Sequence, residues 1–437
     1  MTTQIFYAST LYGAVTLAAA LDSGRFPPAD RRLLLVATTA AVPETAVPLD
    51  RMPGFARLRE RFDGVLSWND TIAPFHPGGW SPRPDDVPLW ERYLRLLWRL
   101  GEDEPVELVV ESLQVAPALT VARLFPDAPV DVYADGLMSY GPTRSRLDPL
   151  VGERVRRLLH LDLVPGLRPL LLAEFGAEPE VVPAEAFMKV VDELADGEAL
   201  DAAPEGCALL LGQYLAALGI LSPAEEEALH LRMVRGAVAR GHRRLVFKPH
   251  PAAPASWSTA LEREAAELGA ELTVLDRPVL AEVHFRRLRP ALVVACFSTG
   301  LFTASRFYGV PVARAGTGPL LDRLAPYENS NRVPVTLADA LLPGLEDGAD
   351  GDRAGGSPDL AGLVAAVGFA MQPRVRPDLR PAAERFLSAH PAARVRYVKR
   401  RRLTVLGLPG GLPASRNATA RRLARRIRRL ARTALGR

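Results

Sequence analysis

The sequence predicts an α/β protein with two Rossmann-like halves. Short apolar runs of strand type alternate with helical patterns from residue 4 to residue 340, which is typical of parallel sheets covered by helices. Two runs, residues 245–247 and 292–296, end abruptly in side chains that bind anions. Because ligands bind beyond the carboxyl ends of the strands in open α/β sheets, these run ends predict an anion pocket around which the chain is organised.

The first half shows a βαβ rhythm, and we expect residues 1–195 to form one domain. The expected strands are residues 4–8, 33–37, 62–68, 106–110 and 130–133, and the expected helices are residues 14–21, 89–100, 117–125, 154–161 and 186–194. Residues 71–88 are rich in Pro, Gly and Trp and predict a functional loop that carries His76.

The second half repeats the pattern after a polar linker at residues 196–205, and we expect residues 206–343 to form the second domain. The expected strands are residues 207–211, 245–247, 272–275, 292–296 and 310–313, and the expected helices are residues 223–240, 261–268, 280–288 and 301–308. Residues 344–358 are acidic and Gly-rich and predict disorder. We expect residues 359–400 to form helices that pack back on the body.

Composition narrows the class of protein. At 437 residues with 48% hydrophobic residues, the chain is long enough for two domains. The two cysteines, Cys207 and Cys296, lie within apolar runs, which predicts buried core residues and neither a disulfide nor a metal site. The N-terminus lacks the pattern of a secretory signal, and no window has 18 consecutive apolar residues, so we expect a cytoplasmic protein without a transmembrane helix.

The charge is distributed unevenly. Sixteen basic residues and no acidic ones follow Glu384, so residues 1–384 carry a net charge of −12 within the total of +4. The tail, residues 401–437, ends in a helical pattern with apolar residues on one face and nine arginines from Arg416 onward. We expect residues 416–437 to bind an anionic membrane surface. We do not expect nucleic-acid binding, because the tail has no aromatic residues for base stacking.

The candidate anion pocket combines two groups of residues. Lys248, His250 and Pro251 follow the strand at residues 245–247, and Ser298, Thr299 and Gly300 follow the strand at residues 292–296 and open a helix. A histidine and a lysine bind phosphate through charge, and a helix N-terminus binds it through free N–H groups. Taken alone, His250 also fits a surface turn, and Ser298 and Thr299 also fit an ordinary helix cap.

A carboxylate ends one strand of the first half. Asp135 precedes Gly136 just beyond residues 130–133, where it fits either a general base facing the ligand or an ordinary Asp–Gly turn. We interpret His76 as a loop residue on the acceptor side and His160 as a structural residue. No cluster has the spacing of metal ligands, and no P-loop, G-x-G-x-x-G or G-x-S-x-G motif occurs.

Three short motifs stand in the order of a known family: Ala134-Asp135-Gly136, then His250-Pro251, then Ser298-Thr299. They resemble the bacterial sialyltransferases, in particular the polysialyltransferase-like family, over most of residues 1–340. The sequence departs from the family at one position. The family usually has two acidic residues before the glycine, and here the first is Ala134.

The resemblance implies a GT-B fold, in which two Rossmann-like domains face each other across a cleft. It implies an inverting, metal-independent transfer of sialic acid from CMP-sialic acid to a glycan acceptor such as a capsule polysaccharide, without a cofactor, at the inner face of the cell membrane. The first domain then holds the acceptor and the second the CMP donor. Asp135 is the implied general base, His250, Ser298 and Thr299 contact the CMP phosphate, and Gly212 and Gln213 lie near the nucleotide.

Two other classes of protein fit the same residues. One is another GT-B member, such as a Kdo transferase or a nucleotide-sugar epimerase, which can share the His-Pro turn. The other is a non-catalytic, membrane-docked protein that binds a nucleotide or a glycan, which would fit Ala134 in the acidic motif.

Overall fold

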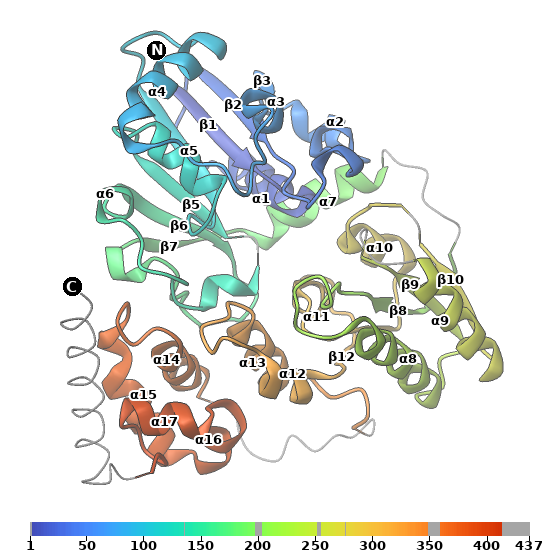
Figure 1. Cartoon of the computed structure of the whole chain (residues 1–437). Coiled ribbons are helices and arrows are strands. Elements are labelled where there is room, and N and C mark those ends of the chain that lie inside the picture. The colour runs from blue at the N-terminus through green and yellow to red at the C-terminus, as the bar shows by residue number, and fades with distance from the viewer. Residues whose placement is uncertain are drawn as a thin grey trace, which may run out of the picture. The chain divides into compact units, whose positions relative to one another are not determined.

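The computed structural model describes residues 2–134, 136–196, 203–250, 255–275, 277–347 and 359–412. The chain divides into two compact units, Met1–Pro358 and Asp359–Arg437. The first unit holds two parallel sheets with their helices, and the described part of the second unit is helical (Figure 1). The two sheets confirm the predicted α/β class with two Rossmann-like halves.

The first sheet has seven parallel strands in the order β3-β2-β1-β4-β5-β6-β7. Their bounds are β1 (Thr3–Ala8), β2 (Arg31–Val36), β3 (Gly64–Ser67), β4 (Val106–Glu111), β5 (Val130–Ala134), β6 (Val155–Leu161) and β7 (Glu178–Val182). The central strand β1 is buried along its whole length, with Ile5 opposite Leu33 on β2 and Leu108 on β4. Its unbroken run of buried residues reflects helices on both faces of the sheet.

Helices α4 and α5 lie on one face of this sheet and α1 and α7 on the other (Figure 1). The helices are α1 (Leu11–Asp22), α2 (Phe55–Arg59), α3 (Trp68–Ile72), α4 (Val87–Leu97), α5 (Ala118–Leu124), α6 (Pro149–Gly152) and α7 (Ala184–Asp196). Short 3-10 turns are η1 (Pro43–Thr45), η2 (Leu49–Arg51), η3 (Pro84–Asp86), η4 (Leu137–Tyr140) and η5 (Ala173–Phe175). The core beneath α4 and α5 includes Trp68, Trp98 and Phe125.

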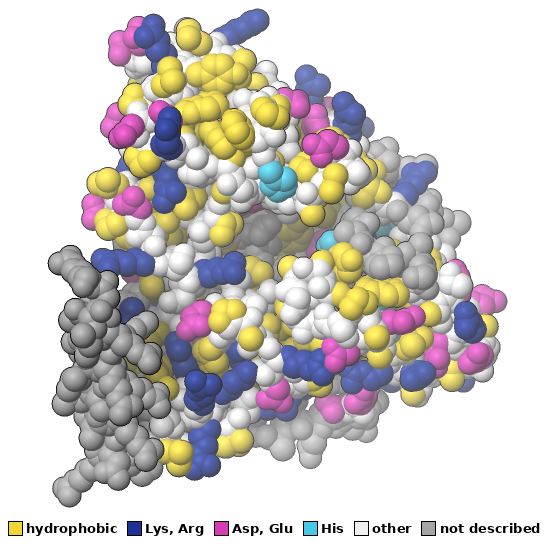
Figure 2. Space-filling view, in the orientation of Figure 1, with side chains coloured by type: hydrophobic (Ala, Val, Ile, Leu, Met, Phe, Trp, Pro, Cys, Tyr) yellow, Lys and Arg dark blue, Asp and Glu magenta, His cyan; other side chains and the backbone are white. Residues whose placement is uncertain are grey.

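The outer face of α4 is apolar. Leu94 is the buried residue of this helix, whereas Leu89 and Leu96 are 69% and 71% exposed. Figure 2 shows apolar side chains gathered on the part of the surface that carries α4. The amphipathic pattern of residues 89–100 thus predicts the helix correctly, but several of its apolar residues face solvent.

The structure corrects the sequence prediction at residues 154–161, which form strand β6 and no helix. The apolar spacing of Val155, Leu158 and Leu159 resembles a helical face, but both sides of this strand are buried, which removes the alternation typical of strands. Pairing with β5 on one side and β7 on the other decides the structure. Strand β7 was not predicted from the sequence, because it is a short edge strand that contains Pro179.

The second sheet has five parallel strands in the order β10-β9-β8-β11-β12. The strands are β8 (Ala208–Leu211), β9 (Arg244–Lys248), β10 (Glu271–Val274), β11 (Leu292–Ala295) and β12 (Val312–Arg314). The helices are α8 (Pro223–Ala239), α9 (Ala255–Glu267), α10 (Ala281–Leu288), α11 (Thr299–Tyr308), α12 (Thr317–Arg323) and α13 (Arg332–Leu341). Both cysteines are free and buried, as the sequence predicts.

The second unit contains α14 (Leu360–Met371), η6 (Pro377–Leu379), α15 (Arg380–Ala389), α16 (Pro391–Tyr397) and α17 (Arg400–Leu406). Most residues of α14 are buried, and it packs against α15 where Gly362 approaches Phe386. The expected membrane-binding segment, residues 416–437, and most of the expected disordered segment, residues 344–358, lie outside the described residues. Within the described part of the chain, no helix is long and apolar enough to cross a membrane.

Candidate active site

Three loops meet at the carboxyl edge of the second sheet. They follow β8, β9 and β11, and they are neighbours because β8 lies between the other two strands. These loops bring seven of the candidate residues to one edge of the sheet: Gly212, Gln213, Lys248, His250, Ser298, Thr299 and Gly300. The eighth candidate of this half, Pro251, lies outside the described residues.

Two hydrogen bonds join the loops to one another. The N–H of Gly212 donates to the carbonyl oxygen of Lys248 at 2.9 Å, and the N–H of Phe297 donates to Gln213 Oε1, also at 2.9 Å. A Cβ on Gly212 would lie 3.0 Å from the Phe247 ring, so glycine allows the close approach of these two loops. The Gln213 amide thus connects the end of β8 to the end of β11.

The N-terminus of α11 lies at this edge, next to the end of β8. Ser298 caps the helix, and its Oγ accepts a hydrogen bond from the N–H of Gly300 at 3.2 Å. Gly300 is buried, and a Cβ there would lie 2.9 Å from the Leu211 side chain at the end of β8. The first turn of α11 therefore presents the positive end of the helix dipole beside the end of β8, which favours an anion there.

Lys248 occupies a half-buried position at the end of β9. Burial lowers its pKa, and the charge of Glu282 on α10 acts in the opposite direction. Glu282 is itself buried and accepts a hydrogen bond from Thr303 Oγ1 at 2.7 Å. Glu282 and Thr303 were not identified from the sequence, because in a helical pattern a glutamate reads as a surface charge.

His250 is exposed and lies in an aromatic cluster. Its ring centroid is 5.9 Å from that of Tyr214, which in turn is 5.9 Å from Trp257. The pKa of His250 is lowered mainly by the partial loss of solvation among these neighbours and, to a smaller extent, by the nearby charge of Lys248. At neutral pH the imidazole is therefore more often neutral than a free histidine, until an anion binds beside it.

A close contact brings the first half to this edge. Gly136 follows β5, and a Cβ added there would lie 2.7 Å from Thr299 Oγ1. The acidic turn and the N-terminus of α11 are thus in contact, although Gly136 and Thr299 are far apart in sequence. Asp135 directly precedes Gly136, and its own placement lies outside the described residues.

A second carboxylate, Glu111, ends the neighbouring strand β4. It accepts hydrogen bonds from Ser9 N–H at 3.2 Å and from Tyr133 Oη at 3.3 Å. The pKa of Tyr7 on the adjacent strand β1 is raised mainly by burial and, to a smaller extent, by the charge of Glu111. No role was assigned to Glu111 from the sequence, although it carries the same signal as Asp135, a carboxylate just beyond a buried strand.

The two other histidines singled out from the sequence have structural partners. His160 is buried in β6, where its Nδ1 lies 3.1 Å from the Leu161 carbonyl oxygen. His76 joins two loops, because Gly78 N–H donates to Nδ1 at 3.1 Å while Nε2 lies 2.9 Å from the carbonyl oxygen of Ala40. Neither lies among the residues at the edge of the second sheet. The described ranges contain no group of His, Cys, Asp and Glu side chains that could hold a metal ion.

The described fold is that of an enzyme with two parallel-sheet α/β domains, and the match to a family of glycosyltransferases gives its class. The family model described as alpha-2,8-polysialyltransferase (POLYST) matches residues 4–317, so the chain belongs to this family. The match includes all three motifs, from Asp135 to Thr299, and agrees with the resemblance found in the sequence. No curated protein matches the chain.

Solved structures similar to this chain share little sequence with it. The GT-B domain of a Photobacterium damselae sialyltransferase is 11% identical, with a TM-score of 0.41, and the alignment covers 78% of this chain and 98% of that one. Acinetobacter baumannii MurG is 13% identical, with a TM-score of 0.39 and coverages of 79% and 85%. The S. aureus MnaA structure with UDP is 14% identical, with a TM-score of 0.41 and coverages of 78% and 88%.

Proposed function

We propose that the protein transfers sialic acid from CMP-sialic acid to a glycan acceptor, with inversion at the anomeric carbon. The observation that carries this proposal is the contact of Gly136 with Thr299, because it joins the turn after β5 in the first domain to the N-terminus of α11 in the second, where the phosphate is proposed to bind. Membership of the polysialyltransferase family supports the choice of donor.

The donor phosphate is proposed to bind at the edge of the second sheet. Ser298, Thr299 and the N–H groups of the first turn of α11 hold its oxygens, and Lys248 supplies a positive charge. His250 contacts the same phosphate, where the bound anion raises the pKa of the imidazole and favours its charged form. These groups oppose the charge that develops on the leaving phosphate, so the proposed transfer does not require a metal ion.

The acceptor is activated by Asp135 in this proposal. Asp135 takes the proton from the acceptor hydroxyl as its oxygen attacks the anomeric carbon from the side opposite to CMP. The new C–O bond forms while the bond to the phosphate oxygen breaks, and its electron pair leaves with CMP. A single displacement of this kind inverts the anomeric centre, through an oxocarbenium-like state resembling that of glycoside hydrolysis.

Glu111 has a proposed supporting role. The family usually has two carboxylates before the glycine, and Ala134 replaces the first of them. Glu111 ends the strand next to β5, opposite Tyr133 in the register of the sheet. We propose that it supplies the second negative charge of the acidic site from β4.

Nucleotide binding tests this proposal directly. Thermal stability would be measured with CMP, UDP, GDP or buffer alone, for the wild type and for His250→Ala. A nucleotide at about 100 times its dissociation constant adds about 2.7 kcal/mol to the free energy of unfolding. We expect stabilisation by CMP only, reduced in the variant. Stabilisation by UDP instead of CMP would indicate another class of GT-B enzyme, and no stabilisation by any nucleotide would contradict the proposal.

The place of action is proposed to be the inner face of the cell membrane. The nine arginines between Arg416 and Arg437 alternate with apolar residues at helical spacing, a pattern that binds anionic lipid surfaces. A protein held there would meet growing glycans on the cytoplasmic side.

A further inference from the structure

A buried carboxylate near the start of α8 holds the loop that follows β8. The side chain belongs to Glu226, which is 0% exposed. Its Oε1 accepts a hydrogen bond from the N–H of Leu215 at 2.7 Å, and its Oε2 accepts one from the N–H of Ala216, also at 2.7 Å. Two short bonds of this kind replace part of the solvation that a carboxylate loses when it is buried.

The helix end that carries Glu226 is itself fixed. Ser222 and Glu225 form a capping box, in which Ser222 N–H donates to Glu225 Oε2 at 2.9 Å and Glu225 N–H donates to Ser222 Oγ at 3.3 Å. Glu225 also pairs with Arg323 on α12. The two adjacent glutamates therefore have different tasks, because Glu225 stabilises the start of the helix while Glu226 binds the backbone of the loop.

The loop forms a closed turn beyond the two residues that Glu226 binds. Ile220 N–H donates to the carbonyl oxygen of Leu215 at 3.0 Å, and Gly219 N–H donates to the carbonyl oxygen of Ala216 at 3.0 Å. The carbonyl groups of Leu215 and Ala216 are thus bonded within the loop, whereas their N–H groups depend on the carboxylate of Glu226. Removal of this carboxylate would leave a buried N–H without its acceptor, which disfavours the present conformation of the loop.

The other end of the loop is attached to the proposed phosphate site. Gly212 N–H donates to the carbonyl oxygen of Lys248, and Gln213 Oε1 accepts from the N–H of Phe297, both at 2.9 Å. The segment between these bonds and Glu226 is therefore held from two sides. A loop that is fixed before the ligand arrives binds it with little ordering cost.

Tyr214 lies within this held segment. Its ring centroid is 5.9 Å from that of His250 and 5.9 Å from that of the buried Trp257. Tyr214 directly precedes Leu215, the first residue that Glu226 binds. The backbone position of Tyr214 therefore depends on Glu226, and the Tyr214 ring forms part of the surroundings of His250, a proposed phosphate ligand.

We propose that Glu226 is a positioning residue for donor binding, which acts through the loop at residues 212–216. This inference rests on the proposed function, and it adds a buried carboxylate that is not itself a ligand to the groups that determine donor affinity. Its contribution should appear in the affinity for the donor and not in the transfer step, because the groups proposed for the transfer do not belong to the loop.

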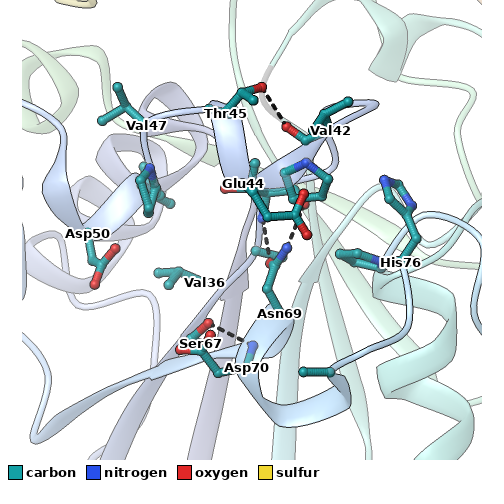
Figure 3. A pocket seen from close by; sticks show the side chains of 18 of the residues that line it. Val36, Val42, Glu44, Thr45, Val47, Asp50, Ser67, Asn69, Asp70 and His76 are labelled. Atoms are coloured by element: carbon teal, nitrogen blue, oxygen red, sulfur yellow. Dashed lines mark hydrogen bonds between the residues drawn. The ribbon is translucent and has the colours of Figure 1, made fainter.

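A side chain with a comparable task in the first domain provides a control. Asn69 on α3 holds the loop after β2, because its Oδ1 accepts from Thr38 N–H at 2.9 Å and its Nδ2 donates to the Thr38 carbonyl oxygen at 3.0 Å (Figure 3). None of the proposed donor ligands belongs to that loop. Asn69→Asp exchanges an amide for a carboxylate of the same shape, just as Glu226→Gln makes the reverse exchange.

The test compares Glu226→Gln with Glu225→Gln and Asn69→Asp in the full chain. The glutamine keeps the shape of Glu226, but its NH2 group cannot accept a bond from a backbone N–H, so one of the two amides loses its partner. We expect the CMP affinity of Glu226→Gln to fall about tenfold. KM for CMP-sialic acid should rise by a similar factor, with kcat changed less than about twofold. Hydrogen exchange at the Leu215 and Ala216 amides should become faster in this variant. The two controls should lose stability and keep the donor KM of the wild type.

The outcomes separate this inference from the proposed function. If CMP does not stabilise the wild type, the proposed function fails, and this inference fails with it. If CMP binds the wild type but Glu226→Gln has the CMP affinity and donor KM of the Glu225→Gln control, Glu226 has a structural role only and the inference is wrong. A fall in kcat at unchanged donor KM would also contradict it. Should Glu226→Gln not fold, Glu226→Asp is judged by the same criteria, because it keeps both oxygens and withdraws them by one methylene group.

Discussion

At the residue scale, Gly136 lies against Thr299, and a Cβ added to Gly136 would be 2.7 Å from Thr299 Oγ1. The backbone of Gly136 is extended, with φ near 180°, so any residue could adopt its conformation. Lack of space, and not backbone strain, therefore requires glycine here. The contact thus brings the turn after β5 to the proposed phosphate site at the N-terminus of α11.

Gly136→Ala tests this contact. The methyl group must displace Thr299 or the turn, so we expect a loss of about 1–3 kcal/mol in the free energy of unfolding. Turnover of CMP-sialic acid should fall at least about tenfold, because a shift of the reacting groups raises the barrier. Gly79→Ala is the matched control, since a Cβ there would have no neighbour within 4 Å. Equal turnover in the two variants would show that the contact is not important for transfer.

The lowered pKa of His250 predicts a pH dependence for nucleotide binding. The free imidazole loses its proton below the usual value of 6.5, and a bound phosphate raises its pKa. CMP affinity should therefore rise as the pH falls through the interval between the bound and free pKa values, and then level off. His250→Gln should remove the part of the pH dependence that is due to His250. The titration of CMP itself affects both proteins equally, so it cancels when the two pH profiles are subtracted. Parallel profiles for wild type and variant would exclude His250 as a phosphate ligand.

At the element scale, the site depends on where strands end and helix α11 begins. The sequence predicts these places because the signals are local: an apolar run followed by Ser298 as cap, or by Lys248 and Pro249. It fails where distant residues decide the structure. Residues 155–161 form a strand because β5 and β7 pair with them, and the loops after β2 and β3 are joined by hydrogen bonds between Asn69 and Thr38 and between His76 and Ala40. No local sequence pattern predicts such contacts between residues that are far apart in the chain.

Removing the cap of α11 separates stability from binding. Ser298→Ala should lower the free energy of unfolding by about 1 kcal/mol, the usual effect of losing an N-cap side chain. It should also weaken CMP binding, because Ser298 is a proposed phosphate ligand. Ser222→Ala provides the control, since Ser222 caps α8 through a capping box that includes Glu225 and is not one of the proposed phosphate ligands. A similar loss of stability with unchanged CMP affinity in both variants would leave Ser298 with a structural role only.

At the scale of the whole molecule, the chain combines a body of net charge −12, residues 1–384, with a strongly basic tail. The body holds both α/β domains, and the sequence predicts their class because alternating strands and helices leave a clear apolar pattern.

The tail predicts salt-sensitive attachment to membranes. Each arginine near an anionic lipid surface contributes about 1 kcal/mol, so nine should give firm binding to vesicles containing phosphatidylglycerol. Binding should weaken strongly at about 1 M salt, where the Debye length is about 3 Å. Sedimentation of the full chain with vesicles would be compared with a chain ending at Leu412. Equal binding by both chains, or binding insensitive to salt, would contradict the proposed role of the tail.

The most direct test of the central claim is the turnover of CMP-sialic acid by Asp135→Asn, measured together with stabilisation by CMP. The variant keeps the size of the side chain and removes the proton acceptor. We expect turnover with a glycan acceptor to fall by a factor of about 100 or more, the usual contribution of a general base, while CMP stabilises the variant as it does the wild type. Turnover close to that of the wild type would show that Asp135 is not the base and would contradict the proposed mechanism.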